Sequence, residues 1–407
     1  MNNTRILRTT NILLLLTGYQ LHWFVAKSHR FRVSIVPVIG LVVLSCIYIA
    51  CLVQHFEAHS LLQLVKSMSP FLHGLIRLQA LLGVKVFIYA FYASARSIGP
   101  ANDIAKTLPF KSNGSGNDRK DYYAYALIFS TLSVLFGLGF YIAYEMDFVL
   151  PPLEHIMIGL GLFIPHYVLG GALRFFNILS WLSCDQLQHL RTDVEEELGV
   201  CMAKQNAKIE LASTSLATSG SSVRMEALQR QCQQLEQLAG RLERLFQAMQ
   251  RSLILLFVVN SHCLLGGIYI YIYYYNVWYV LLEGSLRRVF YAGNILIYAC
   301  ILCDYIGLLL TQMLLQRERS KFLEHLKLSL SQREWMPKDM RSVVKDMRNI
   351  LCSAFNFKFC SVLRFDVAHF ALLQILQGLT IAVIVLYVYF NDTISAINDS
   401  IGGNDDE

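Results

Sequence analysis

Polar side chains recur along one face of the most C-terminal apolar segment. Gln377, Thr380, Ile384, Tyr387 and Asn391 are spaced by three and four residues, which places them on one side of a helix. Polar groups that face lipid carry a free-energy penalty, so we expect this face to meet protein or water. Copies of the stripe around an axis would form a polar path narrowed by an apolar ring at Ile384. Alternatively, the stripe packs inward within a single bundle.

A second group of residues has the character of a small-molecule site near the outer ends of the membrane segments. Tyr269 and Tyr273 share a helical face, and other polar or aromatic side chains lie at a similar depth. The candidate set is His73, Arg77, Gln79, Tyr141, Tyr269, Tyr273, Asn294 and Tyr298. These residues could line a pocket open to the outside. An aromatic belt at the membrane interface, together with helix packing, is the alternative explanation.

Two charged side chains lie deep within apolar segments. Lys85 and Asp304 are at a similar depth in segments that run in the same direction. Because burying an isolated charge in a membrane is costly, we predict that they form a structural charge pair. The alternative is that each is neutralised or reaches the interface by itself.

Catalytic motifs are not evident in the sequence. A Gly-rich phosphate loop, a nucleophile elbow and a helical His-Glu-x-x-His motif are all missing. Histidines in or near the apolar segments are scattered, which favours hydrogen bonds between helices over a shared site: His155, His166, His262 and His369. Cys300 and Cys303 have metal-motif spacing but no second pair, so we interpret them as small apolar residues. We therefore expect no enzyme activity, cofactor or metal.

The elements that must position these residues are membrane-spanning helices. The chain is 55% hydrophobic and 16% charged, which is too apolar for a soluble protein of 407 residues. About 20 apolar residues cross the hydrocarbon layer as a helix. Seven segments reach that length: Val33–Val53, Phe71–Ala93, Tyr123–Tyr144, Leu153–Leu173, Leu253–Tyr275, Val289–Leu310 and Val367–Phe390. The predicted fold class is an all-α integral membrane protein with seven transmembrane helices.

An earlier apolar run, Asn11–Val25, is short for a span. A signal peptide would need a small-x-small cleavage site, which is not found, and a basic cluster follows the run. We predict an interfacial or re-entrant helix within a cytoplasmic segment at residues 1–32. A spanning run would raise the count to eight and change the topology.

The distribution of basic residues predicts the orientation. Of the 35 Lys and Arg residues, Lys66, Arg287 and Arg288 fall at the presumed outer ends, and Arg77 and Lys85 lie inside a segment. All the others fall on the opposite side, which the positive-inside rule places in the cytoplasm. The N-terminus is then inside and the C-terminus outside. This bias also explains the net charge of +6, so we expect no nucleic-acid partner.

The predicted order of regions follows from the spans. Residues 33–173 hold the first four helices and 253–310 the fifth and sixth; residue 367 begins the seventh, which ends at 390. Residues 174–252 are expected to be cytoplasmic helical extensions joined by a Ser-rich hinge, because Leu and Met recur at spacings of three and four from Val223 to Gln250. Residues 311–366 are expected to form cytoplasmic anchor helices, and a tethering role is the alternative. The acidic tail, 391–407, carries a glycosylation acceptor at Asn398.

With this plan the chain resembles the insect gustatory receptors, relatives of the insect odorant receptors. The family motif in the last span is Thr-Tyr, five apolar residues, then Gln-Phe. Here Thr380 and the apolar middle are retained, while Ile381, Tyr387 and Val388 replace the other motif residues. Sugar-sensing members usually carry Glu after Thr-Tyr, where this chain has Ala382. The resemblance therefore implies a receptor for a non-sugar tastant, bitter or sensed on contact.

The resemblance also implies a mechanism and an assembly. It implies a ligand-gated, non-selective cation channel in the plasma membrane of sensory-neuron dendrites. The subunits would form a homotetramer, or a heterotetramer with related receptors, and the last span of each subunit would line the pore. Two other functions are left open by the residues themselves: a seven-helix receptor acting through G proteins, and a membrane transporter or enzyme.

Overall fold

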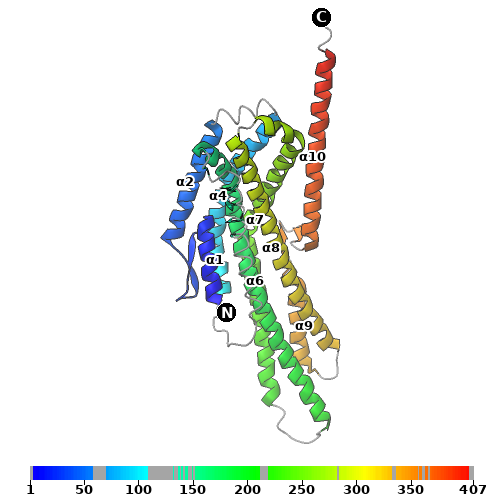
Figure 1. Cartoon of the computed structure of the whole chain (residues 1–407). Coiled ribbons are helices and arrows are strands. Elements are labelled where there is room, and N and C mark those ends of the chain that lie inside the picture. The colour runs from blue at the N-terminus through cyan, green and yellow to red at the C-terminus, as the bar shows by residue number, and fades with distance from the viewer. Residues whose placement is uncertain are drawn as a thin grey trace.

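The computed structural model is built from long helices and two short hairpins (Figure 1). It describes residues 3–57, 70–108, 152–210, 219–281, 284–331, 336–355, 357–359, 363–364 and 367–402, with a few isolated positions between 132 and 149. The helices are α1 (Asn3–Thr17), α2 (Ile35–Glu57), α4 (Pro70–Ala105), α6 (Leu153–Glu210), α7 (Ser219–Leu281), α8 (Gly284–Ser331), α9 (Lys338–Ser353) and α10 (Val367–Gly402). The antiparallel hairpins pair β1 (His22–Val25) with β2 (Arg30–Val33), and β3 (Lys358–Phe359) with β4 (Leu363–Arg364).

Six helices in the described residues are long and apolar enough to cross a membrane. They are α2, α4, α6, α7, α8 and α10. Each corresponds to a segment predicted from hydropathy, although Val33–Val53 begins in β2, two residues before α2. The fold class is confirmed as an all-helical membrane protein. The remaining predicted segment, Tyr123–Tyr144, lies mostly outside the described residues.

Three of these helices continue well beyond the membrane segments. α6 has 58 residues, α7 has 63 and α8 has 48, so α7 alone is about 95 Å long. The predicted extensions of the fourth and fifth spans are confirmed as continuous helix. We call the projecting part, residues 185–210, 219–250 and 316–331 with α9, the stalk; it forms the lower half of Figure 1.

The stalk is held together by an apolar seam. α9 is strongly amphipathic and buries Met340, Val343, Val344, Met347 and Leu351. It packs against α7 and α8, where Leu235, Leu242 and Leu326 are also buried. The first part of the predicted anchor region, from residue 311 to Ser331, is the end of α8 and not a separate element. Most of the Ser-rich hinge, Ala212–Ser222, lies outside the described residues.

The N-terminal region differs from the prediction. The expected helix Asn11–Val25 is wrong in its second half, because α1 ends at Thr17 and Gly18 adopts a φ of +65°, which glycine accepts without strain. The chain then enters β1. α4 secures the hairpin, since the Asn102 side chain accepts from the Phe31 N–H at 2.6 Å and donates to the Phe31 carbonyl at 3.0 Å.

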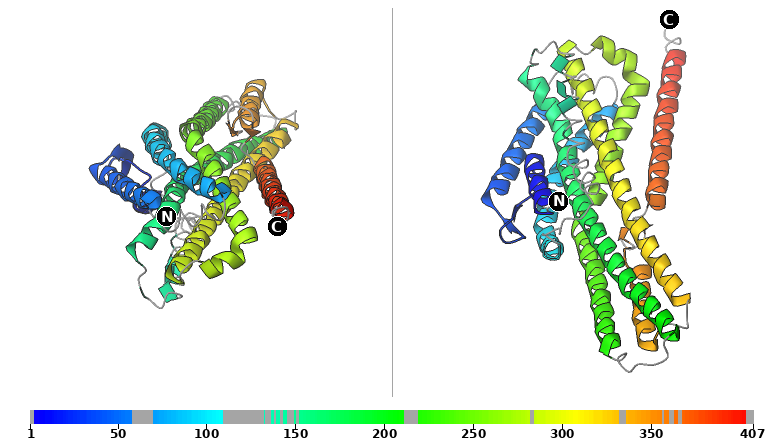
Figure 2. Two further views of the ribbon diagram at one scale, coloured as in Figure 1. Left: turned by 90° about the horizontal axis from the view of Figure 1, so that it is seen from above. Right: turned by 60° about the horizontal axis from the view of Figure 1, so that its bottom comes forward.

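The last long helix, α10, lies at the edge of the bundle (Figure 2). It contacts α7 and α8, and among its described side chains Ile381 and Val385 are buried, at 6% and 4% exposed. Most of its other apolar side chains are exposed in the single chain. This surface therefore meets lipid or another protein.

Candidate functional site

Helices α4, α7 and α8 converge around Cys263, which is buried on α7. The Gln79 amide of α4 donates to the Cys263 sulfur at 3.8 Å. From α8, the Tyr298 hydroxyl reaches the backbone of α7 at Gly267, where an added Cβ would overlap it. Gly267 thus permits the close approach of a tyrosine that is half-buried between the helices.

The same seam between α4 and α7 continues above and below Cys263. The Tyr269 ring is fully buried and meets Phe71 edge-on, with ring centroids 5.1 Å apart. His262 donates from Nε2 to the Leu75 carbonyl at 2.7 Å. We call Gln79, Cys263, Gly267, Tyr269 and Tyr298 the three-helix site.

The Tyr298 hydroxyl is the chemically notable group of the three-helix site. It is buried and has no hydrogen-bond partner among the described residues. A buried hydroxyl without a partner carries a desolvation cost, which a ligand or water with a polar group would offset. The three-helix site therefore combines the buried ring of Tyr269 with a hydroxyl that makes no hydrogen bond among the described residues.

The predicted ligand-binding set is only partly brought together. Gln79, Tyr269 and Tyr298 join the three-helix site, and His73 is half-buried six residues before Gln79 on α4. Arg77 does not join it, because residues two apart face opposite sides of a helix. Its exposed guanidinium lies 6.0 Å from the ring centroid of Phe56 on α2. Tyr141 and the side chains of Tyr273 and Asn294 lie outside the described residues.

The predicted pair of Lys85 and Asp304 is wrong. Asp304 pairs instead with Arg174 of α6, with Nη2 and Oδ1 3.0 Å apart and both side chains almost fully buried. Lys85 is exposed on α4. Similar depth does not make two residues neighbours: α8 packs along α6, and Asp304 faces that helix.

Arg174 was missed because charge counting placed it at the inner end of the fourth span. Its signal in the sequence was Gly170, one helical turn earlier. A Cβ at Gly170 would lie 2.5 Å from Asp304 Oδ2 and 3.1 Å from Arg174 Nη2. The glycine opens the space in which the two charges meet.

Two intramembrane histidines form hydrogen bonds between helices, as predicted. His166 Nδ1 of α6 donates to Asn260 Oδ1 of α7 at 2.9 Å, and both side chains are buried. His262 bonds α7 to α4 as described above. These contacts fix the register of α7 against its neighbours.

The polar stripe of α10 lies at the border between its bundle-facing and exposed sides. The Gln377 amide donates to the Ser261 hydroxyl of α7 at 2.6 Å, and Ile384 is half-buried. Thr380, Tyr387 and Asn391 are exposed. In a single chain, therefore, two members of the stripe contact the bundle and three are available to water or to another subunit.

No protein-family model matches the sequence, and the comparison with curated proteins finds no match either. Among solved structures, the chain is similar to the insect olfactory receptor OR5 from Machilis hrabei, determined in complex with eugenol. The TM-score is 0.56 at 13% sequence identity, and the match covers 95% of this chain and 98% of that receptor chain. The chain therefore has the fold of an insect olfactory receptor.

Proposed function

We propose that this chain is a subunit of a ligand-gated, non-selective cation channel that detects small organic molecules. The observation that carries the proposal is the receptor-like fold over 95% of the chain. Most described side chains of α10, both apolar and polar, are exposed in the single chain. Such a helix suits a channel whose pore forms between subunits. The protein acts as a channel and not as an enzyme.

In the proposed channel, α10 of each subunit lines the pore of a homo- or heterotetramer. Thr380, Tyr387 and Asn391 face the ion path, and Gln377 and Ile384 lie where α10 meets α7. A hydrophobic ring at Ile384 closes the path by excluding water, because a narrow apolar constriction is easily dewetted. Movement of α7 against α10 reaches this ring directly through the bond between Gln377 and Ser261.

The proposed ligand site is the three-helix site. The buried Tyr269 ring and the unpartnered Tyr298 hydroxyl suit a small, mostly apolar molecule with one polar group. The olfactory receptor with the same fold was solved with eugenol, a small molecule. We infer a gustatory role for a non-sugar tastant from the motif around Thr380 and from Ala382, with the chain in the plasma membrane of sensory dendrites.

The decisive experiment is to record currents from cells that express this chain alone or with related subunits. A panel of bitter and other non-sugar compounds should evoke cation currents in outside-out patches, without added nucleotides or cytosol. Cells that lack the chain are the control. If surface-expressed protein gives currents only when G proteins are supplied, the channel proposal is wrong and the receptor acting through G proteins is favoured.

The ligand site has its own test. Gln79→Leu and Tyr298→Phe should raise the ligand concentration needed for half-maximal current by about tenfold, the effect of losing one hydrogen bond to a bound ligand. Leu78→Ala is the matched control, because Leu78 is exposed on the next face of α4. Equal sensitivity of all three variants to the ligand would place the site elsewhere.

A further inference from the structure

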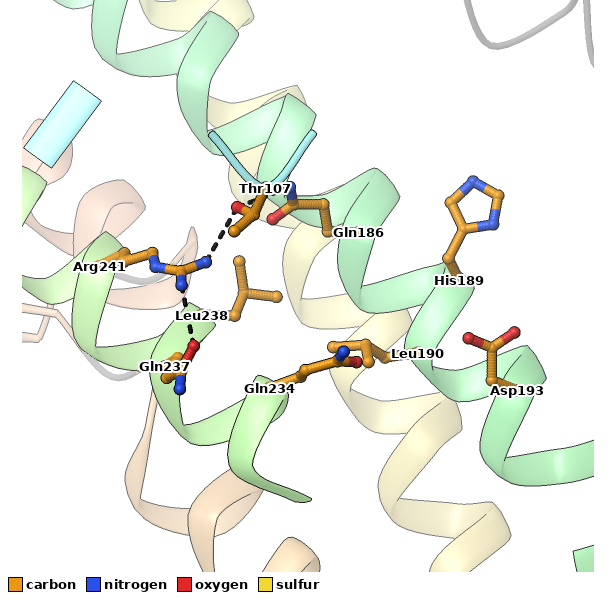
Figure 3. Close-up of a pocket in the computed structure, with 9 residues that line it drawn as sticks. All are labelled: Thr107, Gln186, His189, Leu190, Asp193, Gln234, Gln237, Leu238 and Arg241. Carbon is orange, nitrogen blue, oxygen red and sulfur yellow. Dashed lines mark hydrogen bonds between the residues drawn. The ribbon is translucent and has the colours of Figure 1, made fainter. Parts of the chain in front are cut away.

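A cavity of about 320 Å³ lies in the stalk, remote from the three-helix site. It is bounded by α6, by α7 and by Thr107, which follows the end of α4 (Figure 3). Its lining residues are Thr107, Gln186, His189, Leu190, Asp193, Gln234, Gln237, Leu238 and Arg241. This volume is at the lower end of the range for small-molecule sites.

Arg241 is the cation of this cavity, and its hydrogen bonds go to neutral groups. Nη1 donates to Thr107 Oγ1 and Nη2 donates to Gln237 Oε1, each at 2.9 Å. Two carboxylates lie near the cavity: Asp193 lines its α6 wall, and Asp103 is engaged by Arg244 at 3.2 Å and by Lys106 at 3.7 Å. Within the described part of the chain, no carboxylate forms an ion pair with Arg241.

The rest of the wall suits an organic molecule. Leu190 and Leu238 are buried side chains that form an apolar face. Gln186 donates to Thr107 Oγ1 at 3.2 Å, and Gln234 projects from α7 at the cavity edge (Figure 3). Amide groups beside an apolar face provide contacts for a planar, partly polar organic group that carries an anionic substituent.

A second cavity, of about 630 Å³, adjoins the first. The two share Thr107, Gln237 and Arg241, so the hydrogen-bonded trio forms the partition between them. The second cavity adds Lys106 and Arg244, which strengthens the positive potential at Arg241 although Asp103 is also present. An anion on either side of the partition would meet the Arg241 guanidinium.

The position of the cavity favours a soluble ligand over a lipid. α4 runs to Ala105, about 18 Å along its axis past Ala93, the inner end of the predicted span. The headgroup layer adds only about 5–8 Å on each side of the hydrocarbon. With the span ending at Ala93, as hydropathy predicts, the partition falls beyond the headgroup layer on the basic side of the molecule.

We propose that this stalk cavity binds a small soluble organic oxyanion, a phosphate ester or a carboxylate, through Arg241. The planar guanidinium fits either group with two parallel hydrogen bonds. The bound oxyanion replaces Thr107 and Gln237 as the partner of Arg241, which loosens the link between the end of α4 and α7. This site is independent of the proposed channel function.

Binding is tested on the full chain in lipid nanodiscs by calorimetry and thermal shift. The probes are phenyl phosphate, benzoate and inorganic phosphate, with benzyl alcohol as the uncharged analogue. At least one organic anion should bind saturably with a Kd below about 1 mM and raise Tm, and the three anions distinguish phosphate, carboxylate and free-ion recognition. Arg241→Gln should weaken binding at least tenfold, whereas Arg230→Gln, on α7 outside the cavity, should not.

A second variant keeps the test valid if Arg241→Gln is poorly folded. Gln234→Glu places a negative charge at the exposed cavity edge and should weaken anion binding, while Gln233→Glu, exposed but outside the cavity, should leave it unchanged. Three outcomes overturn the proposal: no saturable binding of any anion, equal binding of benzyl alcohol, or equal effects of the cavity variants and their controls.

Discussion

The guanidinium of Arg174 and the carboxylate of Asp304 lie 3.0 Å apart inside the helix bundle, joining α6 to α8. Each side chain is almost completely buried, so neither charge has water to solvate it. The energetic consequence is asymmetric. Removing both charges can be nearly neutral, whereas removing one leaves an uncompensated buried charge.

The first prediction follows from this pair. Arg174→Met or Asp304→Leu alone should destabilise the protein by ~3–5 kcal/mol and lower surface expression, while the double variant should recover most of the loss. Thermal unfolding of the purified proteins measures this. Lys85→Ala is the control and should change stability by less than about 0.5 kcal/mol, because Lys85 is exposed. Additive losses in the double variant would show that the pair is not coupled.

The second prediction concerns the glycine beneath Tyr298. Gly267→Ala should lower stability by about 1–3 kcal/mol, because the new methyl group overlaps the tyrosine hydroxyl. Adding Tyr298→Phe removes that hydroxyl and should restore part of the stability. The neighbouring Gly266→Ala is a matched control, since a Cβ there meets no atom within 4 Å. A Gly267→Ala protein as stable as Gly266→Ala would contradict the close contact.

The third prediction concerns the gate in the proposed channel. Ile384→Ser should wet the apolar ring and raise the current without ligand. Val383→Ser, about 100° around the helix at a side chain that is 64% exposed, should change resting current much less. Patch recordings at matched surface expression compare the two. A silent Ile384→Ser channel that still opens with ligand would place the gate elsewhere.

The fourth prediction is a pH dependence at the N-terminal hairpin. Burial lowers the pKa of His22 to about 4, against 6.5 for an exposed histidine. The unfolded state therefore binds a proton at higher pH than the folded state does. Above pH 6.5, His22 should not change the free energy of unfolding. As pH falls from 6.5 toward 4, the free energy of unfolding should decrease by up to ~3 kcal/mol.

The pH effect has a specific control. His22 lies against Phe31 and Phe175, with ring centroids 5.2 and 5.1 Å away, so a charge there is poorly solvated. His22→Asn cannot take up the proton and should flatten the stability curve between pH 6.5 and 4. The measurement is the unfolding midpoint of the variant and of the parent chain at each pH in that range. If the two midpoints change with pH in parallel, His22 is not the source of the pH dependence.

The fifth prediction concerns orientation. An epitope tag after Glu407 should be stained on intact cells, and a tag before Met1 only after permeabilisation, because the positive-inside rule predicts that the N-terminal side is cytoplasmic. Asn398 should also be glycosylated, so Asn398→Gln should increase electrophoretic mobility. The reverse staining pattern would favour a receptor of the G-protein-coupled orientation.

The sequence predicted the long helices well because hydropathy reports them directly. Each described membrane segment coincides with an observed helix, except that Val33–Val53 begins two residues before α2, and the repeat of Leu and Met from Val223 to Gln250 correctly indicated the stalk part of α7. The N-terminal error has a different cause. A buried apolar run such as Asn11–Val25 looks the same as helix or strand, and the positive φ of Gly18 separates the two only in the structure.

Contacts between helices were less accessible to prediction. Depth along a span is readable from sequence, but the direction in which a side chain faces its neighbours depends on packing. Lys85 and Asp304 share a depth yet face different neighbours, whereas Arg174 was assigned to the start of the cytoplasmic helical extension and not to the membrane interior. For the same reason Gln79 and Tyr298 were predicted as site residues, while Gly267, whose missing side chain lets Tyr298 approach α7, was not.

α6 and α7 each run without a break from the membrane segments into the stalk. A tilt of either helix at one end therefore displaces its other end. A rod of about 95 Å that tilts by about 5° displaces its far end by roughly 8 Å, so a sub-ångström adjustment near Cys263 is amplified along α7. The two helices differ in where they can bend. α6 contains Pro165, whose ring removes a backbone hydrogen bond, whereas α7 has no proline along its length. Pro165 therefore marks a point where α6 can bend, whereas α7 has its weak point at the Gly266-Gly267 pair.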